Sequence, residues 1–131
     1  MRRIVGLLAV MVCVPCMMGG TWVSLDGVQP NPPGADGKPQ PNSLFAWGRF
    51  NSDVGIITGT RVLERHDPVT GTQLMPEWNE NGSPPVQQWY CTVIGQCPAG
   101  NWDFKARMPW SGQNGRGVVY SSVVNRTING P

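Results

Sequence analysis

The sequence predicts a small all-β protein: an antiparallel β-sandwich of six or seven short strands, with a small β-barrel as the alternative. After the first 20 residues, short apolar segments alternate with turn residues, and the 131-residue chain contains 17 Gly and 13 Pro. No stretch of this part keeps the i, i+3, i+4, i+7 apolar spacing of a helix. A chain of this length supports one hydrophobic core, so we expect a single folded domain.

The clearest strand spans residues 102–108, where the side chains alternate with a period of two. One face of this strand is apolar and the other is charged: Trp102, Phe104, Ala106 and Met108 against Asp103, Lys105 and Arg107. This pattern is typical of a strand with one face in the core and one in water. It therefore favours sheets packed on a single side.

The first 20 residues differ from the rest. Arg2 and Arg3 precede an apolar run from Ile4 to Met18. The run is shorter than the ~20 residues of a membrane-spanning helix and has the length of a secretory signal core. We expect residues 1–20 to be a signal peptide that leads to a secreted, periplasmic or cell-surface protein. No clean small-x-small cleavage site follows, so an uncleaved anchor in the membrane, or a lipid on a leader cysteine, is the alternative.

Residues 21–42 are expected to hold a first strand and then a long loop. TWVSL supplies the strand. The following GVQPNPPGADGKPQPNS contains five prolines and lacks the donors and apolar surface of a strand ladder. We expect a surface loop or a partly extended linker there, and the β-sandwich domain at residues 43–131.

The remaining strands are expected where apolar segments lie between turns of HDPVTG or NENGSPP type. These segments are 44–50, 55–65, 72–75, 86–94, 102–108 and 117–124.

The order of these strands resembles that of the immunoglobulin-like and fibronectin type III-like modules of bacterial secreted proteins. The resemblance rests on LFAWGRF, GIITGT and the late pair GNWDFKARMPWSGQNGRGVVYSSVV. It covers residues 44–124 at the level of pattern. The widely spaced cysteine pair that bridges the sheets of an antibody domain is missing. The resemblance implies a β-sandwich.

Cys91 and Cys97 are expected to form a disulfide, because a signal peptide would deliver them to an oxidising compartment. Zinc needs about four nitrogen or sulfur ligands, and His66 is the only histidine. A redox site would favour C-x-x-C over five intervening residues. No metal is expected. The bridge closes a short loop, so its stabilisation should be modest, ~2 kcal/mol.

No constellation of residues predicts catalysis. His66 lies in ERHDPVTG, which is typical of a hairpin turn open to solvent. Glu77 and Glu80 flank Trp78 and could suggest a glycosidase pair, but their loop is rich in Asn and Gly, where acids commonly face water. G-x-S-x-G, H-E-x-x-H and phosphate-loop motifs are missing. We expect a protein that is not an enzyme and has no cofactor.

The charge excludes nucleic-acid binding. Without Arg2 and Arg3, eight basic residues face eight acidic ones, and the basic residues are dispersed along the chain. Such a surface has no patch that could neutralise a phosphate backbone.

The six tryptophans are the remaining functional clue. Trp47, Trp89 and Trp102 lie in expected strands and are assigned to the core. Trp78 and Trp110 lie in expected loops beside Pro, Asn or Gly, so they are the candidates for contact with a ligand or partner.

Two function classes follow. The first is a non-catalytic structural or interaction module of the cell envelope or extracellular space, which binds a protein partner or assembles with its own copies. The second is a carbohydrate-binding module that stacks a polysaccharide on Trp78 and Trp110.

Overall fold

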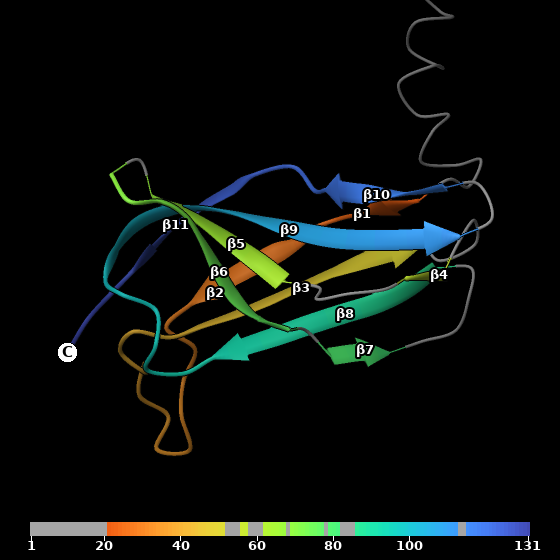
Figure 1. Ribbon diagram of the computed structural model, residues 1–131. Coiled ribbons are helices and arrows are strands. Elements are labelled where there is room, and N and C mark those ends of the chain that lie inside the picture. The colour runs from red at the N-terminus through yellow and green to blue at the C-terminus, as the bar shows by residue number, and fades with distance from the viewer. Residues whose placement is uncertain are drawn as a thin grey trace, which may run out of the picture.

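The computed structural model describes residues 21–51, 56–57, 62–67, 69–77, 79–81, 86–112 and 115–131. In these residues the regular secondary structure is all strand, in two antiparallel sheets (Figure 1). The β-sandwich prediction is confirmed, and the sheets stay open rather than closing into the alternative barrel. The described part of the chain contains no helix long and apolar enough to cross a membrane. The expected signal peptide, residues 1–20, lies outside the described residues.

The first sheet is organised around β3. Its strands are β1 (Trp22–Val23), β2 (Gly27–Pro30), β3 (Leu44–Asn51), β7 (Asn79–Asn81) and β8 (Val86–Val93). The strand order is β1-β3-β8-β7, and β2 also pairs with β3. Because β8 pairs along the whole of β3, the short strands β1 and β2 share the opposite edge of β3, one after the other.

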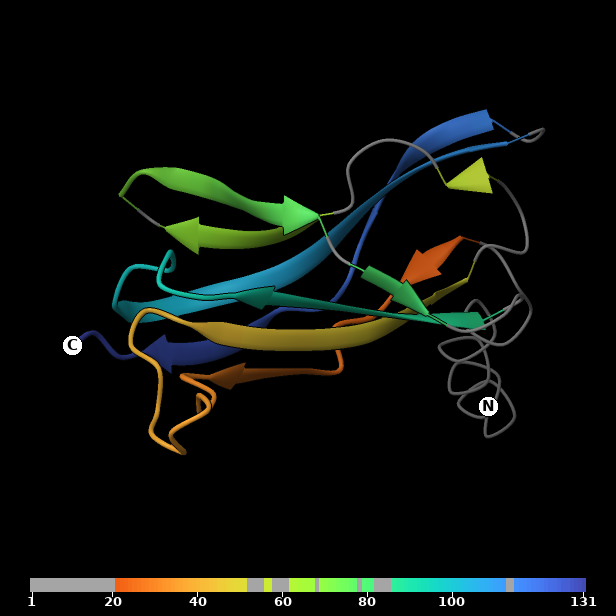
Figure 2. The same ribbon diagram turned by 90° about the horizontal axis from the view of Figure 1, so that it is seen from below.

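The second sheet is organised in the same way around β9. Its strands are β4 (Ile56–Ile57), β5 (Val62–Asp67), β6 (Gly71–Glu77), β9 (Gly100–Gly112), β10 (Gly115–Tyr120) and β11 (Val124–Ile128). β10 and β11 follow each other along one edge of β9, and β5 and β4 lie along the other. Figure 2 shows β9 running at an angle to β3 and β8 of the first sheet.

The proline-rich segment begins as a strand, which corrects the loop expected from residue 27 onward. The Asn31 amide donates to the Ser43 carbonyl at 2.8 Å. Its neighbour Pro30 is paired with Leu44. In an antiparallel ladder, hydrogen-bonded and non-hydrogen-bonded pairs alternate, so Pro30 occupies a position where its missing N–H is not needed. Turns follow over residues 31–42, as expected.

Two further strands differ from the sequence expectation. Residues 117–124 were expected to be one strand, but the strand breaks at Ser121. The Ser121 amide donates to the Ala106 carbonyl at 3.0 Å, and its hydroxyl accepts from the Ala106 amide at 2.8 Å. The chain thereby moves along β9 and continues as β11. The expected turn NENGSPP also begins with a short strand, β7, paired with β8.

The core lies between the two sheets. The burial of residues 102–108 confirms the expected alternation of inward and outward side chains. Phe104, Ala106 and Met108 are fully buried, and Asp103 is exposed. Lys105 and Arg107 are half-buried because Glu64 lies between them, with N to O distances of 3.5 and 3.8 Å.

Trp89 is buried in the core, as expected, and Gly48 makes room for it. Its Nε1 donates to the Ser24 carbonyl at 2.9 Å. A Cβ on Gly48 would lie 2.0 Å from that carbonyl oxygen and 2.6 Å from Nε1. Close packing therefore requires glycine at this position, where β3 pairs with β8. Trp102 is half-buried, and Trp47 lies outside the core.

Three asparagines tie the loop after β2 to the end of the chain. The Asn31 side chain donates to the carbonyls of Gln40 and Asn129 at 2.7 and 2.8 Å, and its Oδ1 accepts from the Asn129 amide at 2.9 Å. The Asn42 amide also donates to the Asn129 carbonyl, at 2.8 Å. Asn31 and Asn42 have φ angles of 47° and 55°, a region that Asn tolerates better than most residues.

Candidate functional site

The candidate site forms on the outer face of the first sheet. Successive side chains of a strand point to opposite faces. In β3, Leu44 and Ala46 are therefore buried between the sheets, while Phe45 and Trp47 point outward. Tyr90 of β8 is the register partner of Trp47 and shares this face.

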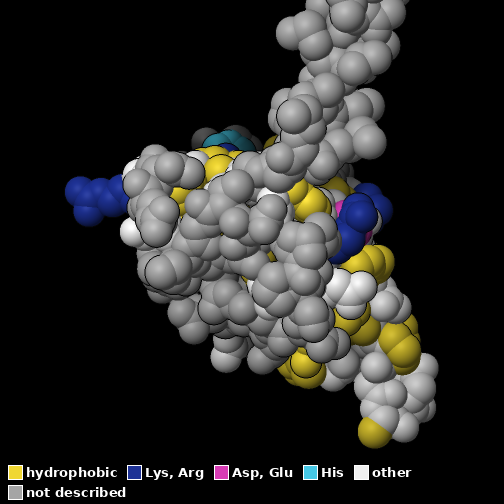
Figure 3. Space-filling view, turned by 90° about the vertical axis from the view of Figure 1, so that its right-hand side faces the viewer, with side chains coloured by type: hydrophobic (Ala, Val, Ile, Leu, Met, Phe, Trp, Pro, Cys, Tyr) yellow, Lys and Arg dark blue, Asp and Glu magenta, His cyan; other side chains and the backbone are white. Residues whose placement is uncertain are grey.

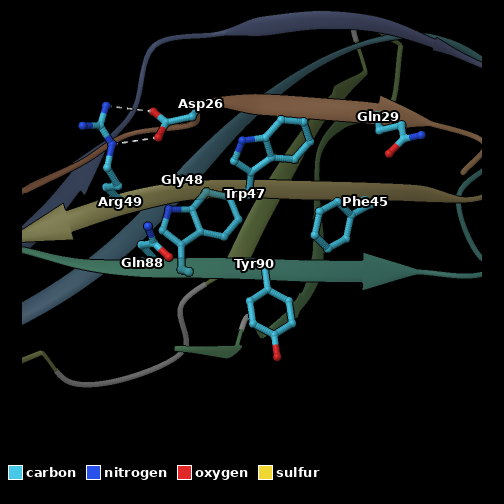
Figure 4. A pocket seen from close by; sticks show the side chains of 9 residues that line it. Asp26, Gln29, Phe45, Trp47, Gly48, Arg49, Gln88 and Tyr90 are labelled. Atoms are coloured by element: carbon cyan, nitrogen blue, oxygen red, sulfur yellow. Dashed lines mark hydrogen bonds and ion pairs between the residues drawn. The ribbon is translucent and has the colours of Figure 1, made fainter. Parts of the chain in front are cut away.

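Phe45, Trp47 and Tyr90 form a contiguous aromatic surface, the aromatic platform (Figure 4). The ring centroids of Phe45 and Trp47 are 5.6 Å apart and their planes differ by 26°. The Phe45 and Tyr90 centroids are 6.2 Å apart, with 38° between the planes. Trp47 is 39% exposed and Tyr90 is 40% exposed. Large exposed apolar groups that gather in one place mark binding surfaces more often than scattered ones do.

Gly27 gives the Trp47 indole its place. Gly27 of β2 is the register partner of Trp47. A Cβ at Gly27 would lie 2.3 Å from Cζ2 of the indole and 2.6 Å from Cη2. The six-membered part of the indole thus extends across β2 at a position without a side chain. The ring therefore packs against the sheet at this point, and only the part of Trp47 that stays exposed is available to a ligand.

Polar groups border the platform. The Arg49 guanidinium forms an ion pair with Asp26, with 2.8 Å between Nε and Oδ2. The hydrogen bond to Asp26, and then the charge of this carboxylate, raise the pKa of Arg49, so it stays a cation. Gln29 and Gln88 add amide donors and acceptors. Together with the aromatic rings these groups line a shallow groove of about 440 Å³.

Of the two tryptophans that the sequence indicated as contact residues, Trp110 is not among the residues that line this groove. Trp78 lies outside the described residues. Trp110 was expected in a loop, but it lies in β9, half-buried and paired with Gly117 on one side and Ile57 on the other. The loop expectation is wrong because β9 finds partners on both edges well beyond Met108.

Cys91 and Cys97 are both buried free thiols in the structure, and both belong to the core between the sheets. Burial raises the pKa of Cys91 to about 12. Burial also raises the pKa of Cys97, and nearby Arg65 partly offsets this effect. Neither thiol is a nucleophile at neutral pH, because the thiolate is the reactive form. The Cys91–Cys97 disulfide stays a prediction.

The other candidate residues form no site in the described part of the chain. His66 lies at the exposed end of β5 in the β5–β6 hairpin. Glu77 and Glu80 belong to β6 and β7, but their side chains lie outside the description. Among the described residues, no group of three or more His, Cys, Asp or Glu side chains could hold a metal ion.

The sequence does not predict the aromatic platform, because Trp47 lies in an apolar strand and is expected in the core. LFAWGRF is apolar on both faces of the strand, so its alternation does not separate inside from outside. One signal was available. Arg49 shares a face with Phe45 and Trp47, and a charged side chain indicates the face that meets water.

Comparison with known proteins gives no relative. No family model matches the chain, and neither a curated protein nor a solved structure matches it. Function is therefore inferred from the geometry of the site.

Proposed function

We propose that the protein is a non-catalytic carbohydrate-binding module that holds a polysaccharide on the outer face of its first sheet. The observation that carries the proposal is the aromatic platform, with its exposed Trp47 and Tyr90 rings beside polar side chains. The flat face of an aromatic ring carries partial negative charge. It therefore attracts the weakly positive C–H groups on the face of a pyranose ring.

The polar border indicates which sugars fit. Arg49 and Asp26 neutralise each other, so the groove offers no unpaired charge of theirs to an acidic sugar. Gln29 and Gln88 can donate to and accept from hydroxyl groups at the edge of a stacked ring. The groove is open rather than deep, so it suits the side of a long polysaccharide better than the end of one. We infer a neutral polysaccharide with equatorial hydroxyls, such as a β-linked glucan.

The test compares single variants in native gels that contain a soluble β-glucan. Trp47→Ala and Tyr90→Ala should each lose retention, by about tenfold in affinity, if a sugar stacks as well as a nucleic-acid base does, for which an aromatic side chain contributes roughly 1–3 kcal/mol. Tyr120→Ala is the control, because Tyr120 is 49% exposed but lies on the second sheet. Equal retention of all three variants, or no retention of the wild type on any glycan of an array, would contradict the proposal.

An interaction module that assembles with protein is the second candidate. The observation in its favour is β10, an edge strand with no second strand partner among the described residues. Val118 and Tyr120 on this strand, and Val123 beyond it, are exposed apolar side chains. Figure 3 shows hydrophobic side chains at the surface of one end of the molecule, with Lys and Arg side chains near them. Edge strands with apolar side chains are templates for pairing with another chain.

Sedimentation measurements test this second candidate. Self-association that Val118→Lys abolishes would support pairing through β10, and a monomer at all concentrations would exclude assembly with its own copies. For a protein partner, loss of co-purification in Val118→Lys but not in Trp47→Ala would assign the contact to β10.

The proposed location outside the cytoplasm rests on the sequence of residues 1–20. We propose that residues 1–20 direct export, and that the oxidising compartment joins Cys91 to Cys97. Burial of both thiols in one core supports the pairing. Peptide mapping without reductant should find the two cysteines in one linked fragment, and free thiols in the exported protein would contradict the bridge.

A further inference from the structure

Arg65 is a buried arginine of β5 that lines a cavity together with residues of the β5–β6 hairpin and of the connection from β8 to β9. Figure 2 shows these two segments at the same end of the molecule. Arg65 is only 5% exposed. Its guanidinium carbon lies 4.1 Å from the centroid of the Trp102 ring, a cation–π contact. Trp102 is itself held in place, because its Nε1 donates to the Pro98 carbonyl at 2.9 Å. The fold therefore holds this cation in a defined position.

No carboxylate of the described chain neutralises this cation. No ion pair joins Arg65 to an acidic residue of the described segments, and its buried Nε has no hydrogen-bond partner. The neighbouring acid in the sequence, Glu64, interacts instead with Lys105 and Arg107. A buried charge without a counter-charge is strongly unfavourable. Such a group is expected where a ligand supplies the missing charge.

Cys97 does not supply it. Burial raises the pKa of the Cys97 thiol, and this effect outweighs the opposing effect of Arg65. The thiol is therefore neutral at neutral pH, and a disulfide sulfur would carry no charge either. Cys97 therefore provides no negative charge for Arg65, whether it is a thiol or part of a disulfide.

Arg65 lines a cavity of about 200 Å³ that opens to the surface. Gln73 and Gln96 contribute side-chain amides, which can donate hydrogen bonds to an anion. Met75 and Val93 contribute apolar walls, and both are buried. The cavity thus combines one fixed cation, two amides and a small apolar surface.

We propose that this cavity binds the carboxylate of a small organic acid, with the carboxylate on Arg65 and the short aliphatic part against Met75 and Val93. A guanidinium edge presents two parallel N–H donors that match the two oxygens of a planar carboxylate. Arg65 Nε is closed off from solvent, so the two Nη groups would supply the donors of such an edge. The site shares no residue with the aromatic platform, so it is independent of carbohydrate binding.

The experiment is a titration of the folded wild-type protein with butyrate, followed by the NMR signal of the Arg65 Nε–H group, which is assigned by its loss in Arg65→Lys. Butyrate should shift the signal until saturation, and n-butanol, which lacks the charge, should not. Inorganic phosphate should act more weakly, because it is tetrahedral and has no aliphatic part. An unshifted signal, an equal response to butanol, or a response to phosphate as strong as that to butyrate would overturn the proposal.

Variants test whether the arginine is present for a ligand. Arg65→Met should lower butyrate affinity at least tenfold while the ligand-free protein unfolds at the same or a higher temperature, because an apolar chain of similar length fits a core site. Arg65→Lys should also lose affinity, since it keeps the charge without the paired donors. Arg116→Met, on the exposed start of β10, is the control and should bind as the wild type does. Unchanged binding in both Arg65 variants, or a folded Arg65→Met protein that is much less stable without ligand, would overturn the assignment.

Discussion

A single methyl group at Gly27 should weaken sugar binding without removing any aromatic residue. In Gly27→Ala the new Cβ would lie 2.3 Å from Cζ2 of the Trp47 indole, whereas carbon atoms pack best at about 3.5–4.0 Å. The indole must move by more than about 1 Å, so it can no longer lie as it does over β2. The φ angle of Gly27 lies outside the left-handed region, so alanine fits the backbone itself.

The size of the effect follows from what the ring loses. A stacked aromatic contact contributes roughly 1–3 kcal/mol, and a displaced ring keeps part of it, so we expect affinity for the glucan to fall about five- to tenfold. Trp47→Ala sets the upper limit of the loss. Stability should change by less than about 1 kcal/mol, because an exposed ring can move where a core side chain cannot.

Calorimetric titration with a soluble β-glucan measures the affinity, and thermal unfolding checks the fold. Gly130→Ala is the matched control, since its Cβ would meet only Ala99 at an ordinary 3.4 Å. If Gly27→Ala bound the glucan as the wild type does while Trp47→Ala lost it, the position of the indole over Gly27 would not matter for glucan binding. If Trp47→Ala also bound normally, the platform itself would be refuted.

Three further predictions concern the core. Gly48→Ala should destabilise the fold by about 2–4 kcal/mol in urea unfolding, because the new methyl group overpacks the core and disturbs the hydrogen bond from Trp89 to the Ser24 carbonyl. An unchanged unfolding midpoint would show that β3 and β8 can relax around the methyl group. Phe104→Ala should cost ~3–5 kcal/mol and Lys105→Ala about 1 kcal/mol or less; the reverse order would mean that the register is wrong. With reductant present, stability should fall as pH rises from about 9 toward 12, because the unfolded chain loses the Cys91 proton near the ordinary pKa of 9.0 and the folded chain keeps it. Cys91→Val should remove that part of the decline, and an identical pH profile would contradict the role of this thiol.

The fold could be predicted from the sequence because its strands depend on local patterns. The strict alternation of residues 102–108 places Phe104 inside and Asp103 outside, as observed. The strand at Gly27–Pro30 could not be recognised in this way. Its proline is acceptable only because the pairing with β3 puts it at a position where no hydrogen bond forms, and that register depends on residues further along the chain.

The candidate site was harder to predict for the same reason. A tryptophan in an apolar strand such as LFAWGRF indicates burial, and only the neighbouring strands decide which face is covered. Trp47 is exposed because the second sheet packs on the side of Ala46. Arg65 shows the opposite case, since a charged residue in a strand indicates a solvated face, yet it points into the sandwich beside Trp102.

The asparagine contacts at the end of the chain bear on how the protein can be made. Asn31 and Asn129 are 98 positions apart, so the loop after β2, which also has local hydrogen bonds, receives its bonds to Asn129 only after that residue has been synthesised. Likewise, one edge of β9 can pair only after β10 and β11 have been synthesised, because both follow β9 in the sequence. Pairing between such distant segments is slow, and an unfinished chain exposes strand edges while it waits. A nascent chain of this kind completes its second sheet only after β11 has been synthesised, and until then part of it keeps the unfolded state that passage through a narrow export channel requires.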